Sequence, residues 1–507
     1  MRRTWTIVGV AARLAEPMCK LAVVVGLLAL AACAPVPLVD PPALRAEADR
    51  PAQVVASLSP VVRLKGSKLE GFRLADRMQR FRTPGVSIAV VDGGNLVWAR
   101  GFGVVERGKP ALITPTTLFQ AASISKAVTA TATLRLAENK RLSIDEDVNQ
   151  YLTSWKVPES ELTATEKVTL RRILSHTAGT NIHGFLGYTS WDPLPTVPQI
   201  LAGAKPANTA PVRVTATPGS ALSYSGGGTM IEELVLTDVT GKPFPQLMRE
   251  LVLIPAGMRE STFEQPLSAG AALHASSAHD AAGVPLRDRF VVYPELAAAG
   301  LWSTPSDLLA WSTAIADARA GRPLAVLSQA SARAMLTPER GPLGLGPFVR
   351  GEGDALRFGH AGWNEGFHSE VVYFPELGKG AAVMVNGVSG RPLVREILYA
   401  IADEYDWPGF APDTIEPVDV DSSSRDAAVG TFGATFEGAV IEARVRREGE
   451  KLTIESTKLG LRSELVFVSK TSFVVLDTGD EFSLVLGDDG TVDAIDWGGI
   501  VLTRAKS

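Results

Sequence analysis

The sequence predicts an α+β body followed by a small antiparallel β domain. Strand patterns lie at both ends of residues 61–410, helical patterns lie between them, and short β runs separated by turns fill residues 411–507. Strands at both ends with helices between them indicate one antiparallel sheet, closed by the two halves of the chain and flanked by helices. We expect the C-terminal domain to be a small barrel or a sandwich.

The composition narrows the class of protein. A chain of 507 residues is long enough for two or three domains, and 46% hydrophobic with 21% charged residues is typical of a globular protein. The net charge is -5 and there is no basic run, which argues against a nucleic-acid partner. The two cysteines are Cys19 and Cys33. The body therefore contains no disulfide, no thiol nucleophile and no cysteine metal site.

The N-terminus has the parts of an export signal. Arg2, Arg3, Arg13 and Lys20 precede an apolar run of 12 residues, 21–32, which is too short to span a bilayer. It ends in "LAAC", which resembles the bacterial lipobox and implies acylation of Cys33. The alternative is a plain secretory signal with a chance cysteine. An exported lipoprotein is the expectation, with the membrane as partner through its lipid anchor.

The same stretch bears on which methionine starts the protein and on the membrane to which a lipoprotein would be sorted. Met18 begins "MCKLAVVVGLLALAAC", which is a complete short signal, so the start is open between Met1 and Met18. Ala34 implies outer-membrane sorting, facing the periplasm, in a Gram-negative host. We expect residues 1–32 to be the signal peptide and 33–60 to be a Pro- and Ala-rich lipidated tether.

The body is expected over residues 61–410. "VSIAVVD", Gly93-Gly94 and "NLVWARGFGVV" form a strand, tight turn, strand pattern. Helical segments dominate residues 123–340, and strands return at "FHSEVVYF" and "GAAVMVNGV". The β domain spans 411–507 and contains no helix pattern. Its β runs are "VGTFGA", "AVIEARVRR", "KLTIEST", "SELVFV", "SFVVLD", "EFSLVL" and "GIVLTR".

Two serines precede Lys126 in "FQAASISKAVTATATLRLAENK", and only one suits a nucleophile. The pattern predicts a helix from near Ser123 to near Asn139. Positions three apart share a helix face, so Ser123 faces Lys126, whereas Ser125 points about 100° away from it. A serine at a helix N-terminus also lies among unpaired N–H groups that favour negative charge. A partly buried lysine can lose its proton and serve as the base.

Ser-x-x-Lys alone is a weak signal, because serine is a common N-cap and lysine is common on helix faces. Two further stretches strengthen it. "SYSGGG" at 223–228 places Tyr224 before a glycine run, although a tyrosine there can simply be a packed aromatic. "FGHAGWNEGF" at 358–367 has glycines that allow close approach of a ligand, and His360 there is otherwise an ordinary surface histidine.

Taken in order, these three stretches resemble the motifs of the class C β-lactamase family of serine hydrolases. That family includes penicillin-binding D-alanyl-D-alanine peptidases, D-aminopeptidases and esterases. The resemblance covers roughly residues 70–405 and implies a β-lactamase/transpeptidase-like fold with a mostly helical insertion. It is reinforced by "LSHTAGT", "IPAGMRESTFEQP" and "AAAGLWSTPSDLLAW".

The resemblance implies roles for single residues. Ser123 is the acylated nucleophile, and Lys126 and Tyr224 move protons, with the division between them left open. The backbone N–H groups of Ser123 and Trp363 form the oxyanion hole. His360 belongs to the catalytic set. The expected substrate-binding residues are Ser225, Gly226 and Gly362.

Two departures from the β-lactamase pattern affect the substrate. Gly226 replaces the asparagine of the Y-x-N motif, and His360 replaces the lysine of the K-T-G motif; both put β-lactam hydrolysis in doubt. With an unperturbed pKa near ~6.5, His360 offers a hydrogen bond but little charge at neutral pH. We therefore expect neutral esters to outrun carboxylate-bearing substrates, and the preference to narrow towards pH 6.

The expected function is an exported serine hydrolase that acts through an acyl-enzyme on an ester, an amide or a D-amino-acid peptide. The substrate is a small molecule or a fragment derived from peptidoglycan. The first alternative is a true β-lactamase or D,D-peptidase. The second, from another class, is a non-catalytic lipoprotein that binds β-lactams or peptidoglycan. The sequence has no G-x-S-x-G elbow and no H-E-x-x-H, and we expect no metal and no cofactor.

Overall fold

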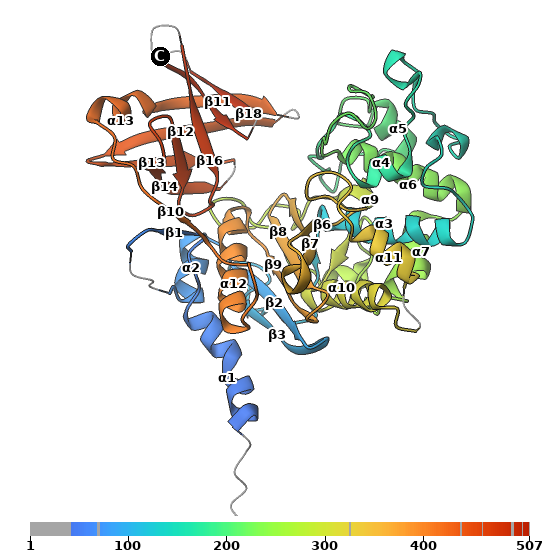
Figure 1. The fold of residues 1–507 in the computed structure, drawn as a ribbon, viewed down its shortest axis with the longest axis horizontal. Coiled ribbons are helices and arrows are strands. Elements are labelled where there is room, and N and C mark those ends of the chain that lie inside the picture. Colours follow the sequence, from blue (N-terminus) through green and yellow to red (C-terminus); the bar gives the residue numbers. More distant parts are fainter. Residues whose placement is uncertain are drawn as a thin grey trace, which may run out of the picture. The chain divides into compact units, whose positions relative to one another are not determined.

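A six-stranded antiparallel sheet, in the order β3-β2-β9-β8-β7-β6, forms the centre of the body in this computed structural model (Figure 1). The structure describes residues 42–67, 71–323, 326–436, 439–458, 460–487, 491–498 and 500–505. The strands of the sheet are β2 Gly85–Asp92, β3 Asn95–Gly103, β6 Phe348–Arg350, β7 Arg357–Asn364, β8 Phe367–Phe374 and β9 Lys379–Val385. Because β2 pairs with β9, the two halves of the chain close the sheet as predicted.

Helices cover both faces of this sheet. α10 (Pro305–Ala320) packs on one face and α12 (Arg391–Glu404) on the other. Alternate residues of β2 enter the two cores: Ala89 and Val91 lie with α10, and Ile88 lies with α12. Successive side chains of a strand point to opposite faces, so a strand buried on both sides has the continuous apolar pattern of "VSIAVV". Gly93 and Gly94 form the turn to β3 with positive φ, as predicted.

The helical region lies between β3 and β6 in the sequence. α3 begins at Ile124 and ends at Glu138, with Ser123 and Asn139 as its caps, which confirms the predicted helix. Short strands β4 (Phe119–Gln120) and β5 (Trp302–Ser303) pair beside it. The other helices of this region are α4 Leu170–Leu174, α5 Val197–Ala202, α6 Gly226–Thr240, α7 Phe244–Met248, α8 Ala269–Leu273, α9 Leu296–Ala299 and α11 Gln329–Met335.

The C-terminal domain is a closed antiparallel barrel of eight strands, which decides between the barrel and the sandwich. Its core contains Phe432, Ile454, Phe473 and Ile495. Among the elements that the sequence prediction missed here are α13 (Ser422–Ala428), which Asp421 caps, and one strand of the barrel. The strands are β11 Gly430–Phe436, β12 Ala439–Glu448, β13 Lys451–Ser456, β14 Leu461–Phe467, β15 Ser472–Val475, β16 Glu481–Leu486, β17 Val492–Trp497 and β18 Ile500–Arg504, of which β17 was the missed one.

Ion pairs join the barrel to the body. Arg77 of α2 (Leu74–Arg80) binds Glu396 through Nε at 2.8 Å and Asp477 of the barrel at 3.0 Å. Arg77 and Glu396 are buried, and a buried charge needs such partners. Lys458, in the turn after β13, binds Glu365 at the tip of the β7–β8 hairpin at 3.0 Å.

The tether expected up to residue 60 is too long. Residues 42–56 form helix α1, and Val54 and Leu58 are buried in the same core as α12. Val62–Leu64 then forms β1, which pairs in parallel with β10 (Asp413–Ile415). The export signal and Cys33 lie outside the described residues. Within the part of the chain that is described, no helix combines the length and the apolar character needed to cross a bilayer.

Candidate active site

The N-terminus of α3 brings Ser123 and Lys126 together. Lys126 Nζ donates to Ser123 Oγ at 3.0 Å, as the three-residue spacing on one helix face predicts. Ser123 follows Ala122, which has a φ of +50°, a value uncommon for a residue with a side chain. Such strain is typical of positions where surrounding packing fixes a functional side chain.

Ser125 has a different environment. Its side chain is fully buried, its Oγ donates to Ala122 O, and it accepts from Leu301 N at 3.0 Å. These hydrogen bonds attach the first turn of α3 to the segment after α9. Ser125 is therefore part of the support of the site, and Ser123 is the serine beside the lysine.

Helix α9 holds the amine of Lys126 from the opposite side. Lys126 Nζ donates to Ala298 O at 2.8 Å, and Lys126 is only 4% exposed. Glu233 of α6 accepts the N–H of Ala297 at 2.8 Å and so attaches the start of α9 to α6. Burial raises the pKa of Glu233 to about 8. The sequence analysis missed Glu233, because a carboxyl group in an apolar helix gives no sign of what it contacts.

Tyr224 lies over the amine and beside the serine. Its ring centroid is 5.1 Å from Lys126 Nζ, and the Ser123 side chain is close enough to its hydroxyl to act on the pKa of Tyr224. Burial raises the pKa of Tyr224 above its ordinary value, so the phenol is neutral at rest. His176 and His183 pack against the ring, with centroid distances of 4.2 and 4.9 Å.

His360 faces Tyr224 as a neutral acceptor. Its Nε2 lies 3.5 Å from the Tyr224 hydroxyl, and its Nδ1 lies 2.6 Å from Ala361 O, which can only accept. The proton of the neutral ring is therefore on Nδ1. Burial, assisted by the nearby charge of Lys126, lowers the pKa of His360 to about 3. The expectation that His360 gains a proton near pH 6 is therefore wrong, because the ring is only 4% exposed.

The β7–β8 hairpin delivers Trp363 to the site. Asn364 pairs with Phe367 across a two-residue turn, and the pair that closes such a turn exchanges backbone hydrogen bonds. Hydrogen-bonded and non-hydrogen-bonded pairs alternate along an antiparallel ladder, so the next pair, Trp363 with His368, is not hydrogen-bonded. The N–H of Trp363 consequently points away from β8. A Cβ on Gly362 would lie 2.1 Å from Ala121 O, so only glycine lets β7 run this close to the start of α3.

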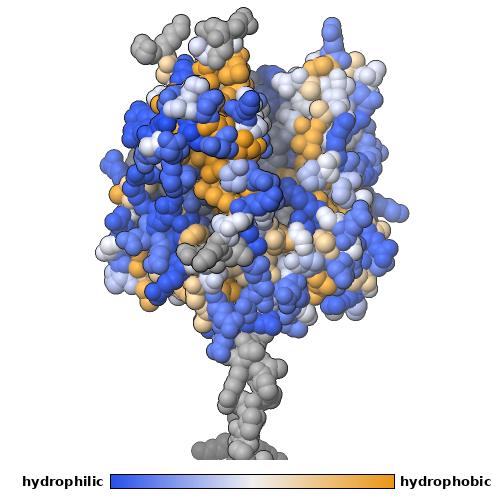
Figure 2. Space-filling view, turned by 60° about the vertical axis from the view of Figure 1, so that its left-hand side comes forward, coloured by the Kyte–Doolittle hydropathy of each residue, from blue (hydrophilic) through white to orange (hydrophobic). Residues whose placement is uncertain are grey.

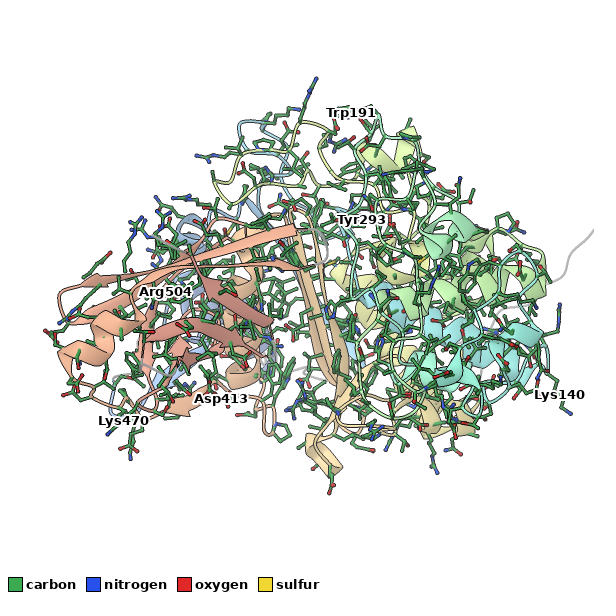
Figure 3. The ribbon with its side chains drawn as sticks, turned by 90° about the horizontal axis from the view of Figure 1, so that it is seen from above. Lys140, Trp191, Tyr293, Asp413, Lys470 and Arg504 are labelled. Atoms are coloured by element: carbon green, nitrogen blue, oxygen red, sulfur yellow. The ribbon has the colours of Figure 1, made fainter. Side chains whose placement is uncertain are left out.

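Polar contacts hold the end of this hairpin in place. Asn364 Nδ2 donates to Gln120 Oε1 at 2.7 Å and to Ala299 O at 3.2 Å. Glu365 N donates to Tyr293 Oη at 3.0 Å. Figure 3 shows Tyr293 beside the strands that run between the barrel and the helical region. The strand carrying His360 and Trp363 is thereby fixed relative to α3 and α9.

The Ser225 side chain caps helix α6. It is 2% exposed, its Oγ accepts from Gly228 N at 3.0 Å, and it donates to Asn181 O at 2.6 Å. A serine before a glycine run also satisfies the unpaired N–H groups of a helix start, and this is its role at the start of α6. The predicted Gly226 and Gly362 are both buried next to site residues.

Comparison with known proteins places the chain in a family. Residues 73–406 match the family model described as Beta-lactamase, and the chain belongs to that family. The unguisins hydrolase ungD' of Aspergillus campestris is 26% identical over 371 residues, which are 65% of this chain and 65% of that protein. The chain therefore spans less than two thirds of this relative's length.

Solved structures agree on the fold. The octameric penicillin-binding protein homologue from Pyrococcus abyssi has a TM-score of 0.57 at 21% identity, with coverage of 85% of this chain and 97% of that one. The D-amino acid amidase from Ochrobactrum anthropi SV3 has a TM-score of 0.52 at 21% identity, with coverage of 65% and 96%. The solved structures thus establish the β-lactamase-type fold.

Proposed function

We propose that this serine hydrolase works through an acyl-enzyme on Ser123 and hydrolyses an ester, an amide or a D-amino-acid peptide. The observation that carries the proposal is the 3.0 Å hydrogen bond from buried Lys126 Nζ to Ser123 Oγ, with the Tyr224 ring centroid 5.1 Å from the same amine. An alcohol needs an adjacent base to become a nucleophile. This arrangement supplies the base and a second proton carrier.

The reaction proceeds in two balanced steps. Ser123 Oγ attacks the carbonyl carbon while its proton passes to the Lys126–Tyr224 pair, and the N–H groups of Ser123 and Trp363 stabilise the negative oxygen. The pair then returns the proton to the leaving alcohol or amine, which departs. Water repeats the attack on the acyl-enzyme and releases the acid. Because the resting phenol is neutral, Tyr224 must lose its own proton before it can accept the proton of Ser123.

The environment of His360 favours substrates without a carboxylate. Its only ring proton is donated to Ala361 O, and its Nε2 faces the Tyr224 hydroxyl. It therefore supplies neither a positive charge nor a free N–H to a carboxylate. Two relatives are consistent with acyl transfer of this kind, one named a hydrolase and one titled a D-amino acid amidase.

Export and lipid anchoring are a separate part of the proposal. They rest on the basic residues, the apolar run and the "LAAC" sequence before residue 34. Mass spectrometry of the N-terminal peptide of the exported protein tests them. An acylated Cys33 as the first residue supports the anchor, and an uncleaved chain with a free Cys33 contradicts it.

A substrate panel tests the catalytic part. Wild type is incubated with p-nitrophenyl butyrate, D-alanine p-nitroanilide and a fluorescent penicillin, with Ser123→Ala as the control. Turnover of the ester or the anilide that is lost in the control supports the proposal. Rapid penicillin turnover with no action on the other two favours the β-lactamase alternative. Stable penicillin labelling without any turnover favours the binding lipoprotein.

A further inference from the structure

The loop Thr180–Gly187, called here the docked loop, is bound to the first turn of α6. Gly226 N donates to His183 O at 3.1 Å, and Gly227 N donates to Ile182 O at 3.0 Å. A Cβ on Gly227 would lie 2.7 Å from Asn181 O, so a side chain there would displace the loop backbone. None of the glycines that follow Tyr224 has a positive φ, so they are not needed for an unusual backbone conformation. Their small size instead lets the docked loop pack against the start of α6.

The docked loop forms one side of the active site. His183 packs on the ring of Tyr224 at a centroid distance of 4.9 Å. Two residues further, Phe185 lies against Gly226: a Cβ on Gly226 would be 2.9 Å from Phe185 Cε2 and 3.1 Å from His183 O. Real Cβ atoms essentially never approach another atom to 2.9 Å, so the Phe185 ring fills the space beside Gly226. The ring also packs against the main core of the body, which limits how far it can move.

We propose that Phe185 determines substrate specificity, because its ring occupies the position that a side chain at residue 226 would need in the Y-x-N pattern. This inference rests on the proposed function and names its substrate class. An amide at that position would hydrogen-bond a polar group of the substrate, whereas the Phe185 ring offers only apolar contact. The site then favours acyl groups that are apolar beside Tyr224 over acyl groups that carry an amide there.

Apolar side chains are exposed on this protein, and Figure 2 shows some of them on both sides of a hollow in the face it draws. Large apolar side chains are exposed close to site residues in the sequence: Leu222 at 41%, two residues before Tyr224, and Trp363 at 49%. Leu186, beside Phe185, is 44% exposed and provides a matched control from the same loop.

A double-mutant cycle tests the inference. Phe185→Ala, Gly226→Asn and the double variant are compared with wild type, using p-nitrophenyl butyrate and the p-nitrophenyl ester of N-acetyl-D-alanine. Gly226→Asn should lower kcat/KM for both esters about tenfold or more, because the new side chain overlaps Phe185. The double variant should recover most of this loss. Its ratio of kcat/KM for the N-acetyl-D-alanine ester to kcat/KM for the butyrate ester should also be about tenfold higher than in wild type. In the double variant the side-chain amide introduced at residue 226 has room beside it and can hydrogen-bond the acetylamino group.

Leu186→Ala should leave the ratio of the two kcat/KM values within about threefold of wild type. Full activity of Gly226→Asn would overturn the inference, because it would show that the space is open. A double variant no better than Gly226→Asn, or one with the wild-type ester preference, would overturn it as well.

Thermal unfolding of the same four proteins separates this inference from the proposed function. If Phe185 fills the space, the Tm loss of the double variant is smaller than the sum of the two single losses. Additive losses contradict the inference whether or not esters are turned over. If the Tm losses are non-additive but wild type turns over no substrate, the conclusion that Phe185 fills the space beside Gly226 stands. The proposed function is then contradicted, and the role of Phe185 in specificity is contradicted with it.

Discussion

The Tyr224 hydroxyl lies 3.5 Å from His360 Nε2, and the other ring nitrogen of His360 already donates to Ala361 O. His360 can therefore accept from Tyr224 but cannot donate to a second partner while it is neutral. The histidine at the position of the β-lactamase lysine thus orients the phenol and does not act as a cation for the substrate. Substrate selectivity and its pH dependence follow from this relationship.

The preference for neutral esters should not change with pH. With its pKa lowered to about 3, His360 stays neutral from pH 8 to pH 5.5, so kcat/KM for a neutral ester relative to a carboxylate-bearing ester should stay constant. Parallel pH profiles of the two esters measure this. A ratio that falls below pH 6.5 would show that the ring is protonated there.

A lysine at position 360 should change that preference. His360→Lys introduces a charged donor, and a charge-assisted hydrogen bond is worth roughly 1.5–3 kcal/mol. We expect the relative kcat/KM for the carboxylate-bearing ester to rise about tenfold. His360→Gln, which stays neutral, is the control. An equal rise in both variants would mean that size rather than charge sets the preference.

Glu233 should act on catalysis through α9. Glu233→Ala leaves the N–H of Ala297 without its partner and loosens the carbonyl that holds Lys126, so kcat should fall about tenfold or more with little change in KM. Because burial raises the pKa of Glu233 to about 8, the neutral amide of Glu233→Gln resembles the resting acid and should retain more activity. The exposed Glu159→Gln is the control. Equal losses in Gln and Ala variants would contradict this positioning role.

Buried carboxyl groups should make the protein less stable as the pH rises above neutrality. Burial raises the pKa values of Glu232, Glu233 and Glu295 to about 8, above the unfolded value of 4.5. The native state therefore binds more protons than the unfolded state between pH 4.5 and 8, so stability decreases with rising pH in that window and levels off above it. Each group contributes at most about 2 kcal/mol between pH 6.5 and 8.

Unfolding scans measure this effect. The Tm should be a few degrees lower at pH 8.5 than at pH 6.5, and the difference should shrink in Glu295→Gln, where one ionisable group is removed. Below pH 6.5 buried histidines such as His360, whose pKa is lowered, act in the opposite direction, because the unfolded state then binds more protons. A Tm that rises from pH 6.5 to pH 8.5 would contradict the assignment.

Local patterns in the sequence were sufficient for part of this site. The three-residue spacing predicted that the side chains of Ser123 and Lys126 lie together on one helix face. The turn at Gly93-Gly94 predicted the hairpin of β2 and β3. Both depend on neighbours in the chain, which periodicity reports directly. At Ser225 a helix cap and a substrate-binding residue look alike in sequence, and the structure shows the cap.

The remaining features depend on contacts between distant segments. Burial sets the protonation of His360, and that burial comes from packing that no local pattern encodes. Glu233 holds α9 from 64 residues away. α1 was assigned to a tether because its Pro and Ala content resembles a linker, although Val54 is buried in a core with α12. Strand β17 was missed because two aspartates, a residue type depleted in strands, interrupt its six residues VDAIDW.

The identity of the acylated serine tests the central claim most directly. Wild type is trapped with a fluorophosphonate or a slowly released penicillin, and the modified peptide is sequenced by mass spectrometry. We predict an adduct on Ser123 and a loss of at least ~10³-fold in rate for Ser123→Ala. Ser125→Ala should lose stability, because Leu301 N loses its acceptor, yet still acylate. An adduct on Ser125, or normal labelling of Ser123→Ala, would contradict the account.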